Sequence, residues 1–390
     1  FLKMEKKMNI PQLRFPEFVD GWNNDTLDNL TERIGDGLHG TPEYVNNSNI
    51  HFINGNNLID GRIQINENTK KVSIQTFEQN SKNLSDKTLL ISINGTIGSV
   101  AKYNNEKVML GKSVGYFNFK ENPDFFYYLL NTSNIQNYFI SELTGSTIKN
   151  LSLKTLRETK VNYPNNIEQT KIANFLTAVD EKIQALKKKQ ILLEQYKKGV
   201  MQKLFSQELR FKDENGNDFP DWEVKKLGEV CEITIGEFVI KTKQNPNGKY
   251  PVFNGGVAPT GYYDEFNNEG NKIIISARGA NAGFVNFQKE KYWAGNSCYS
   301  ISVLNQNLYS IQYFFYYIKM FESNFTENQQ AANIPSVSKT DVENFKIDLP
   351  TLLEQTKIAN FLSAIDEKIN HTKTQIEKMQ EWKKGLLQRM

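Results

Sequence analysis

The sequence predicts an α+β fold with two mixed domains separated by a pair of long antiparallel coiled-coil helices, as a pseudo-twofold internal repeat. Three observations predict it. One helical segment occurs twice, its apolar residues follow the spacing of a coiled coil, and the intervening regions hold short β-rich runs separated by turns. The predicted boundaries are 1–163 for the first domain, 164–208 for the first helix, 209–349 for the second domain and 350–390 for the second helix.

The helical segment is nearly identical in its two copies. Residues 168–183 read EQTKIANFLTAVDEKI and residues 354–369 read EQTKIANFLSAIDEKI, a constant offset of 186 positions that holds through the Lys-Lys-Gly tail of each copy. A weaker repeat, Leu-Arg-Phe, stands at 13–15 and again at 209–211, before each domain. The chain therefore consists of two related half-molecules fused head to tail.

Each copy is predicted to form one helix. Glu168 and Glu354 fall in the first turn, where the helix dipole favours anions, and no proline interrupts the segment that follows. Apolar residues then recur in alternating steps of four and three, which gives one apolar seam typical of coiled-coil packing. The seam residues are Ile172, Leu176, Val179, Ile183, Leu186, Leu193, Val200 and Leu204 in the first copy, and Ile358, Leu362, Ile365, Ile369, Ile376, Met379, Leu386 and Met390 in the second.

Four polar residues, Gln190, Lys197, Thr372 and Lys383, interrupt these seams. We expect them either to weaken the pairing locally or to set its register. A helix of roughly 38 residues is about 57 Å long. The alternative is that each helix is amphipathic and packs only on its own domain, but two near-identical seams in one chain favour pairing with each other.

The two regions between the helices are different in kind. Short β-rich runs end in Asn/Gly turns, and each region also contains an aromatic stretch of helical character. The β-rich runs are 88–93, 114–119, 272–276 and 299–303, and the helical stretches are 125–139 and 309–321. We interpret each region as an α+β domain with a twisted sheet. Because the helices resemble each other more than the domains do, we expect a shared role for the helices and different roles for the domains.

Composition narrows the class of protein. Hydrophobic residues make up 38% of the 390 residues, enough for globular folding, and the net charge of +3 neither requires nor excludes nucleic acid. The two cysteines, Cys231 and Cys298, lack metal-ligand spacing, which fits a reducing cytoplasm and argues against a zinc site or a disulfide framework. No apolar run approaches the length of a membrane span, and the start of the chain lacks a long apolar core, so we expect neither a membrane segment nor a signal peptide.

This organisation resembles the specificity (S) subunit of type I restriction–modification systems over essentially the whole chain. The resemblance is carried by the duplicated PxxxEQTKIAxFLxxxDEKI helix with its Lys-Lys-Gly tail, and by a variable domain before each copy. The segment DGLHGTP at 36–42 is similar to a motif that opens many target-recognition domains of that family. The segment NGG at 254–256 resembles the opening of another type of recognition domain.

The resemblance implies a non-catalytic subunit that reads double-stranded DNA. Each target-recognition domain would read one half of a bipartite, asymmetric target in the major groove, and the paired helices would act as a ruler for the gap between the halves. Two methyltransferase (M) subunits would dock on the helices and adjoining domain surfaces, and two restriction/translocase (R) subunits could join them. S-adenosylmethionine, ATP and Mg²⁺ would belong to those partners, with no cofactor in this chain, and the complex would work in the cytoplasm in host defence.

Candidate DNA-contacting residues follow from the chemistry of the bases and phosphates. Forked donors suit guanine, amides suit adenine, and basic or hydroxyl side chains near glycines suit phosphates. In the first domain the candidates are Tyr44, Arg62, Lys70, Lys71, Asn94, Lys112, Thr147 and Lys149. In the second they are Lys241, Lys243, Tyr262, Arg278, Asn281, Asn296, Gln329, Gln330 and Asn333. Asn94 and Arg278 follow buried-looking strands at the same place in each half. The alternative for any one of them is a solvated surface position.

Motifs that suggest catalysis lack the surroundings that catalysis needs, so no catalytic residue and no metal site is predicted. His39, beside Gly and Thr, is better explained as a hydrogen-bonded member of a loop. Gly111-Lys112-Ser113 resembles the end of a P-loop, but Glu106 stands where the first glycine is required. Two other functions stay open: a coiled-coil protein-interaction scaffold without DNA specificity, and a single-chain nuclease or methyltransferase.

Overall fold

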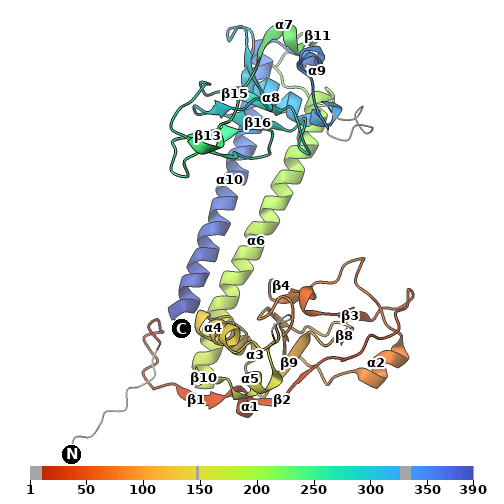
Figure 1. The fold of residues 1–390 in the computed structure, drawn as a ribbon, viewed down its shortest axis with the longest axis vertical. Helices are drawn as coiled ribbons and strands as arrows, with labels where there is room; N and C mark the ends of the chain where they lie inside the picture. Colours follow the sequence, from red (N-terminus) through yellow and green to blue (C-terminus); the bar gives the residue numbers. More distant parts are fainter. Residues whose placement is uncertain (1–10, 146–148, 326–334, 390) are drawn as a thin grey trace, which may run out of the picture. The chain divides into compact units, whose positions relative to one another are not determined.

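The computed structural model describes residues 11–145, 149–325 and 335–389, which divide into two compact units (Figure 1). Unit 1 contains the described residues up to Leu186 together with those from Gln375 onward, and unit 2 contains Lys187–Thr374. Each unit therefore combines one mixed domain with segments of both long helices.

Unit 1 is built on a four-stranded antiparallel sheet in the order β2-β9-β6-β7. Three two-stranded ladders accompany it: β1 with β10 and β4 with β5 are antiparallel, and β3 with β8 is parallel. The strands are β1 (Asn23–Thr26), β2 (Thr31–Asp36), β3 (His51–Ile53), β4 (Leu58–Ile59), β5 (Arg62–Ile63), β6 (Thr88–Ser92), β7 (Val100–Lys102), β8 (Val108–Leu110), β9 (Val114–Phe119) and β10 (Lys160–Tyr163). The short helices are α1 (Leu27–Leu30), η1 (Gly55–Asn57), α2 (Ile74–Asn80), α3 (Pro123–Leu130), α4 (Ser133–Ser141) and α5 (Leu153–Glu158).

The sequence explains where these short helices begin and end. The Ser152 hydroxyl accepts a hydrogen bond from the Thr155 amide at 3.0 Å and so caps α5. The predicted helix over 125–139 is two helices, because Asn131 and Thr132 interrupt it. Their side chains donate to carbonyls at the end of α3, which competes with helix continuation.

Unit 2 repeats this topology with a different sequence. Its four-stranded antiparallel sheet has the order β12-β18-β15-β16, β11 pairs with β19, and β13 lies parallel to β17. The strands are β11 (Glu223–Lys226), β12 (Cys231–Ile235), β13 (Tyr250–Phe253), β14 (Gly261–Tyr263), β15 (Lys272–Ser276), β16 (Val285–Gln288), β17 (Trp293–Ala294), β18 (Cys298–Val303) and β19 (Lys346–Leu349). The short helices are α7 (Leu227–Val230), η2 (Lys241–Lys243), α8 (Ile311–Met320), η3 (Glu322–Phe325) and α9 (Lys339–Asn344).

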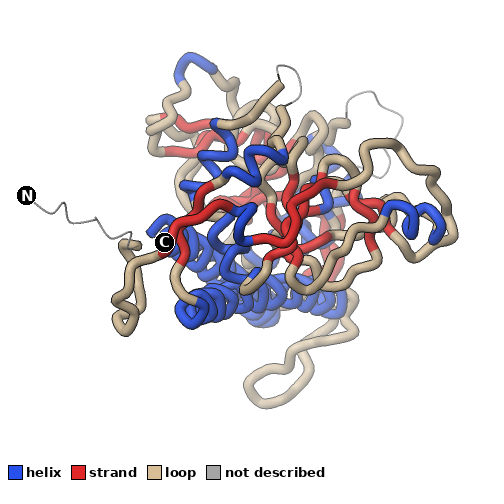
Figure 2. The backbone as a smooth tube through the Cα atoms, turned by 90° about the horizontal axis from the view of Figure 1, so that it is seen from below, coloured by secondary structure: helices blue, strands red, loops and turns tan. Residues whose placement is uncertain are grey.

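The two domains differ mainly in what is added to the shared topology. Unit 1 adds the β4–β5 hairpin and α2, whereas unit 2 adds β14 beside β13. Long loops, drawn in tan, connect the short strands (Figure 2). Each unit has its own principal core, and the strands β6 and β15 at the centre of each sheet are almost wholly buried.

The long helices are α6 (Asn166–Phe205) and α10 (Leu352–Arg389). In unit 1 the first part of α6 packs with the last part of α10, where the rings of Phe175 and Trp382 lie 5.9 Å apart. In unit 2 the last part of α6 packs with the first part of α10, and Leu204 shares a core with Leu362. This order of pairing is antiparallel, so the predicted fold class is confirmed.

The described seam residues of both helices are mostly buried, and they meet their own domain as well as the other helix. Met390 lies outside the described residues. The Tyr128 hydroxyl of α3, for example, donates to Asp180 on α6 at 3.1 Å and lies the same distance from the Thr177 hydroxyl. The alternative that each helix packs only on its own domain is therefore wrong, because each helix also packs against the other helix.

Two of the four polar residues in the seams form ion pairs with the other helix, as we expect of residues that set the register. Lys197 on α6 forms an ion pair with Asp366 on α10, and the distance from Nζ to Oδ1 is 2.6 Å. Lys383 forms the equivalent pair with Asp180, also at 2.6 Å. Thr372 is fully buried, and its hydroxyl donates to a carbonyl of its own helix at 2.8 Å. Gln190 bonds within its own helix, where its side-chain amide donates to Glu194 at 2.9 Å.

A buried ionic cluster joins the start of each long helix to the Leu-Arg-Phe segment of its unit. Arg14 donates two hydrogen bonds of 2.7 Å to Glu168, whose side chain is wholly buried and also accepts from Trp22. These bonds raise the pKa of the Arg14 guanidinium. Arg210, Glu354 and Trp222 repeat the cluster in unit 2. The prediction that a glutamate occupies the first turn of each long helix is thus confirmed. Its arginine partner could not be identified from sequence spacing alone.

Candidate nucleic-acid interface

Several loops of unit 1 meet at one end of its sheet, and we call this surface the unit 1 loop edge (residues 37–40, 54–55, 94–96, 111–113 and 149–150). Short hydrogen bonds hold the loops together. The Ser113 hydroxyl accepts from the Gly55 amide at 2.9 Å, and the Ser113 carbonyl accepts from the Ile93 amide at 2.9 Å. The Ile93 carbonyl accepts in turn from Leu151 at 3.0 Å. The result is a fixed platform of polar loops.

Unit 2 has the same platform, the unit 2 loop edge (residues 236–240, 254–255, 277–279, 295–297 and 335–336). The Ser297 carbonyl accepts from the Ala277 amide at 2.8 Å, and the Ala277 carbonyl accepts from Val337 at 2.8 Å. The Gly255 amide donates to the Cys298 sulfur at 3.0 Å. The two loop edges therefore share their backbone bonding although their side chains differ.

Five of the predicted DNA-contacting residues lie on the loop edges, and Asn281 lies in the turn that follows one of them. Asn94, Lys112 and Lys149 are on the unit 1 loop edge, and Arg278 and Asn296 are on the unit 2 loop edge. Asn94 and Arg278 occupy equivalent places, because each forms a β-bridge to the segment that precedes the last short helix of its domain. Lys112, Lys149, Arg278 and Asn281 are exposed.

The other described candidates lie elsewhere in the two domains, outside the residues that define the loop edges. In unit 1, Lys70 and Lys71 lie on a segment bonded to β3, and the Lys70 ammonium is 6.0 Å from the centre of the Tyr44 ring. Arg62 is exposed on the β4–β5 hairpin. In unit 2, η2 carries Lys241 and Lys243, and β14 carries Tyr262, whose carbonyl accepts from Asn245. Lys243 also forms an ion pair with Glu265 at 3.7 Å. Thr147, Gln329, Gln330 and Asn333 lie outside the described residues.

The sequence-based selection missed two exposed side chains on the loop edges, His39 and Phe238. His39 bonds to Asp36 at 2.7 Å, as expected for a hydrogen-bonded loop member. Phe238 is 73% exposed at the matching place in unit 2. The signal that could have identified both is the glycine two residues earlier, which allows the loop to approach the neighbouring backbone.

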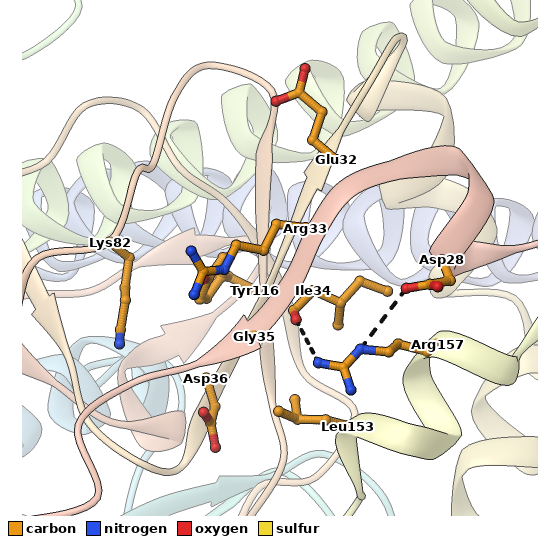
Figure 3. Close-up of a pocket in the computed structure, with 10 residues that line it drawn as sticks. All are labelled: Asp28, Glu32, Arg33, Ile34, Gly35, Asp36, Lys82, Tyr116, Leu153 and Arg157. Carbon is orange, nitrogen blue, oxygen red and sulfur yellow. Dashed lines mark hydrogen bonds and ion pairs between the residues drawn. The ribbon is translucent and has the colours of Figure 1, made fainter.

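A second polar surface of unit 1 is a cavity of about 390 Å³ along the edge strand β2 (Figure 3). Arg33, Lys82 and Arg157 line it, together with the carboxylates of Asp28, Glu32 and Asp36. Arg157 donates to the Ile34 carbonyl at 3.1 Å and lies 3.9 Å from Asp28. Because both signs of charge line the cavity, it suits a phosphate less well than the unit 1 loop edge does.

The cysteines are not placed for chemistry at these surfaces. Burial raises the pKa of the Cys231 thiol to about 12 and that of the Cys298 thiol to about 11, so neither is a thiolate near neutral pH. Within the described ranges, no three His, Cys, Asp or Glu side chains lie close enough to hold a metal ion. No helix in the described part of the chain combines the length and the apolar character of a membrane span.

Comparison with known proteins identifies the family. The family model described as the type I restriction modification DNA specificity domain matches residues 21–195 and, a second time, residues 220–381. The chain belongs to the type I restriction–modification specificity subunit family. The two matched regions follow the internal repeat, since each covers one recognition domain and most of the helix after it.

Relatives agree with this assignment. The chain is 29% identical over 317 residues to a Methanocaldococcus jannaschii protein provisionally named as the specificity subunit of the type I restriction enzyme MjaX, covering 75% of this chain and 73% of that one. A Mycoplasma pneumoniae protein provisionally named as a type I specificity subunit is 31% identical over 162 residues, or 41% of this chain; the match spans only 43% of that relative. The crystal structure of a type I S subunit from M. genitalium matches with a TM-score of 0.66 at 20% identity, over 97% of this chain and 98% of that one, which shows the same fold.

Proposed function

We propose that this specificity subunit reads a bipartite, asymmetric sequence in the major groove of double-stranded DNA, one half with each loop edge. The observation that carries the proposal is that the unit 1 and unit 2 loop edges share their backbone hydrogen bonds but present different side chains. Asn94 in unit 1 corresponds to Arg278 in unit 2, and an amide and a guanidinium recognise different bases. Two platforms of equal shape and unequal chemistry suit two different half-sites, so the target is not palindromic.

The remaining roles that we propose are those expected of a member of this family. The chain itself is non-catalytic, and two methyltransferase subunits dock on it, with two restriction/translocase subunits as further partners in the cytoplasm. S-adenosylmethionine, ATP and Mg²⁺ are bound by those partners. The repeated helices support a spacer role, since a register held by ion pairs gives a helical pair of fixed length.

Domain exchange tests the division of labour. The segment 23–163 is replaced by the equivalent segment of another family member, which keeps Arg14, Trp22 and Glu168 and therefore the ionic cluster at the start of α6. Methylated sites are then mapped genome-wide in cells that express the chimera with a methyltransferase partner. We expect one half of the split motif to change and the other half to persist. A change in both halves would contradict the modular proposal.

A paired deletion tests the spacer. Seven residues are removed from each long helix at equivalent positions, 187–193 and 373–379, so that the two helices stay in register. Seven residues correspond to about 10 Å of helix, which is the length of about three base pairs. We expect the gap to shorten by about that amount with both half-sites intact, whereas an unchanged gap would rule out the spacer role.

The alternative function is a coiled-coil scaffold that binds only protein. It predicts no preference for the methylated motif and no salt dependence of DNA binding. A protein that contacts phosphates loses affinity for DNA steeply as salt rises, typically by about 10³-fold or more between 50 and 200 mM salt. Measuring the binding of target and scrambled duplexes over this range therefore distinguishes the two functions.

A further inference from the structure

The loop after β12 is held in place on both sides of one residue, Phe238. Before it, the Gly236 amide donates to the Cys298 carbonyl at 3.1 Å and the Glu237 amide donates to the Ala294 carbonyl at 2.9 Å. After it, Val239 is buried in a small cluster, and the Ile240 carbonyl accepts from the Tyr263 hydroxyl at 2.7 Å. The loop therefore presents Phe238 from a fixed backbone.

The approach of this loop to the sheet requires a glycine. A Cβ atom on Gly236 would lie 2.3 Å from the Ala294 carbonyl oxygen, too close for any other residue. Gly37 stands at the same place in unit 1, where a Cβ would lie 2.2 Å from the Leu110 carbonyl oxygen. The residue two positions later is His39, whose side chain is 75% exposed. In both domains a glycine that closely approaches a carbonyl oxygen precedes an exposed side chain by two residues. This side chain is the imidazole of His39 in unit 1 and the phenyl ring of Phe238 in unit 2.

An exposed phenyl ring on a fixed loop loses the favourable burial that most Phe side chains gain. Phe238 is 73% exposed, and it is flanked by the exposed residues Glu237 and Ile240, with basic and amide side chains nearby. The backbone of Glu237 forms a β-bridge with Gly295, the residue before Asn296. Lys241 and Lys243 lie on η2, directly after the loop. The two lysines and the amide supply the cations and donors that DNA requires, which favours DNA over a purely apolar protein partner.

We propose that Phe238 contacts the 5-methyl group of a thymine in the half-site read by unit 2. The thymine methyl is the apolar group that a base pair presents in the major groove, and an apolar side chain is its natural complement. Amides and guanidinium groups on the same loop edge read the polar base edges, while Phe238 reads the methyl. His39, at the same place, gives the unit 1 half-site a polar contact instead. This inference rests on the proposed function, because it names one base-specific contact within that site.

Deoxyuridine substitution provides the test, because it removes only the methyl group. The target is first defined by methylation mapping with the wild-type chain. Each thymine of the unit 2 half-site, on either strand, is then replaced singly by deoxyuridine, and affinity is measured for the full chain with the methyltransferase that co-purifies with it. We expect one replacement to weaken wild-type binding about fivefold, the effect of losing about one buried methyl group. We expect Phe238→Ala to weaken binding to the normal target by a similar factor and to be insensitive to that replacement.

Leu304→Ala is the matched control. Leu304 is 62% exposed and follows β18, and its amide donates to the Val230 carbonyl, at the end of the sheet opposite Phe238. We expect this variant to bind like the wild type and to keep the deoxyuridine effect. Phe238→Leu retains an apolar contact, so we expect an intermediate loss.

Four results would overturn the proposal: a unit 2 half-site without thymine on either strand, independent and additive effects of Phe238→Ala and deoxyuridine, an equal loss on target and scrambled DNA, or loss of the methyltransferase without loss of DNA binding. The last would assign Phe238 to a protein contact. Absence of any sequence preference in the wild type is a distinct outcome, because it would overturn the proposed function as well.

Discussion

The Lys197 ammonium lies 2.6 Å from the Asp366 carboxylate, and the Tyr316 hydroxyl donates to the same carboxylate at 2.7 Å. Burial, together with the bond to Asp366, raises the pKa of Tyr316, so the phenol remains a proton donor. Lys383, Asp180 and Tyr128 form the equivalent group in unit 1. An ion pair with one partner on each helix fixes how far the helices can slide past each other.

Removing one member of this group should cost stability. We expect Asp366→Asn to lower the free energy of unfolding by about 1–2 kcal/mol, because it leaves Lys197 partly buried without its counter-ion. Urea denaturation measures the effect. Lys198→Ala, at an exposed neighbouring position, is the control and should change stability by less than about 0.5 kcal/mol. The exchange of charges, Lys197→Asp with Asp366→Lys, should recover part of the loss; no recovery would show that the pair does not set the register.

The buried carboxylate of Glu354 should be more sensitive to the loss of its partner. We expect Arg210→Ala to lower the free energy of unfolding by about 3–5 kcal/mol, because a wholly buried charge is left without its bidentate partner. Glu354→Gln should cost less, since a neutral amide needs no counter-ion. Urea unfolding followed by tryptophan fluorescence measures both variants. Lys212→Ala breaks only an exposed ion pair, and a cost as large as that of Arg210→Ala would contradict the argument.

Replacing a base-reading residue should change the sequence specificity of DNA binding, whereas replacing a phosphate-binding residue should change the affinity for all sequences. We expect Arg278→Ala to weaken binding to the target by about 1–3 kcal/mol and to relax specificity in the unit 2 half-site alone. Lys112→Ala should weaken binding to every sequence alike and make the salt dependence less steep. Affinities for target and singly altered duplexes at several salt concentrations distinguish the two. A relaxed unit 1 half-site in Arg278→Ala would refute the assignment of Arg278.

The thiols should be protected in the folded protein. Their pKa values of about 12 and about 11 lie above the ordinary value because of burial, so thiolate forms only at strongly alkaline pH. We expect no reaction of Cys231 or Cys298 with a disulfide reagent at pH 8 on the time scale of binding assays, and full reaction after unfolding in urea. Rapid labelling of the native chain at pH 8 would show that one of the thiols is open to solvent.

Much of the fold follows from the sequence because the repeat fixes it. The near-identity of 168–183 and 354–369 required equivalent helices, and the seam spacing required a paired partner. The break at Asn131 and Thr132 was not predicted, since aromatic periodicity runs through it while the two side chains bond to the end of α3. The common topology of the domains was not predicted either, because strand order depends on contacts between residues far apart in the chain.

The candidate site was predicted in part. The equivalent places of Asn94 and Arg278 were predicted, because both follow a strand in the sequence, and their contact with DNA stays a prediction. Phe238 was not found, because an isolated Phe in sequence is normally assigned to the core, and only the close approach of Gly236 to the Ala294 carbonyl turns it outward. The role of Lys197 was ambiguous for a similar reason: its partner Asp366 lies far along the chain and comes close only through antiparallel pairing.

One backbone bond has a consequence for the origin of the molecule. The Leu13 amide donates to the Arg389 carbonyl at 3.2 Å, as the Leu209 amide does to the Lys203 carbonyl at 3.0 Å. The bond between Leu209 and Lys203 lies where the chain continues from the first half of the repeat into the second. The bond between Leu13 and Arg389 has the same geometry, although these two residues lie near opposite ends of the chain. An ancestral half-length polypeptide that associated with its own copy would already have contained this contact. Duplication and fusion of its gene would then have freed each domain to diverge separately, so that the two halves of the proposed target could come to differ while the scaffold stayed the same.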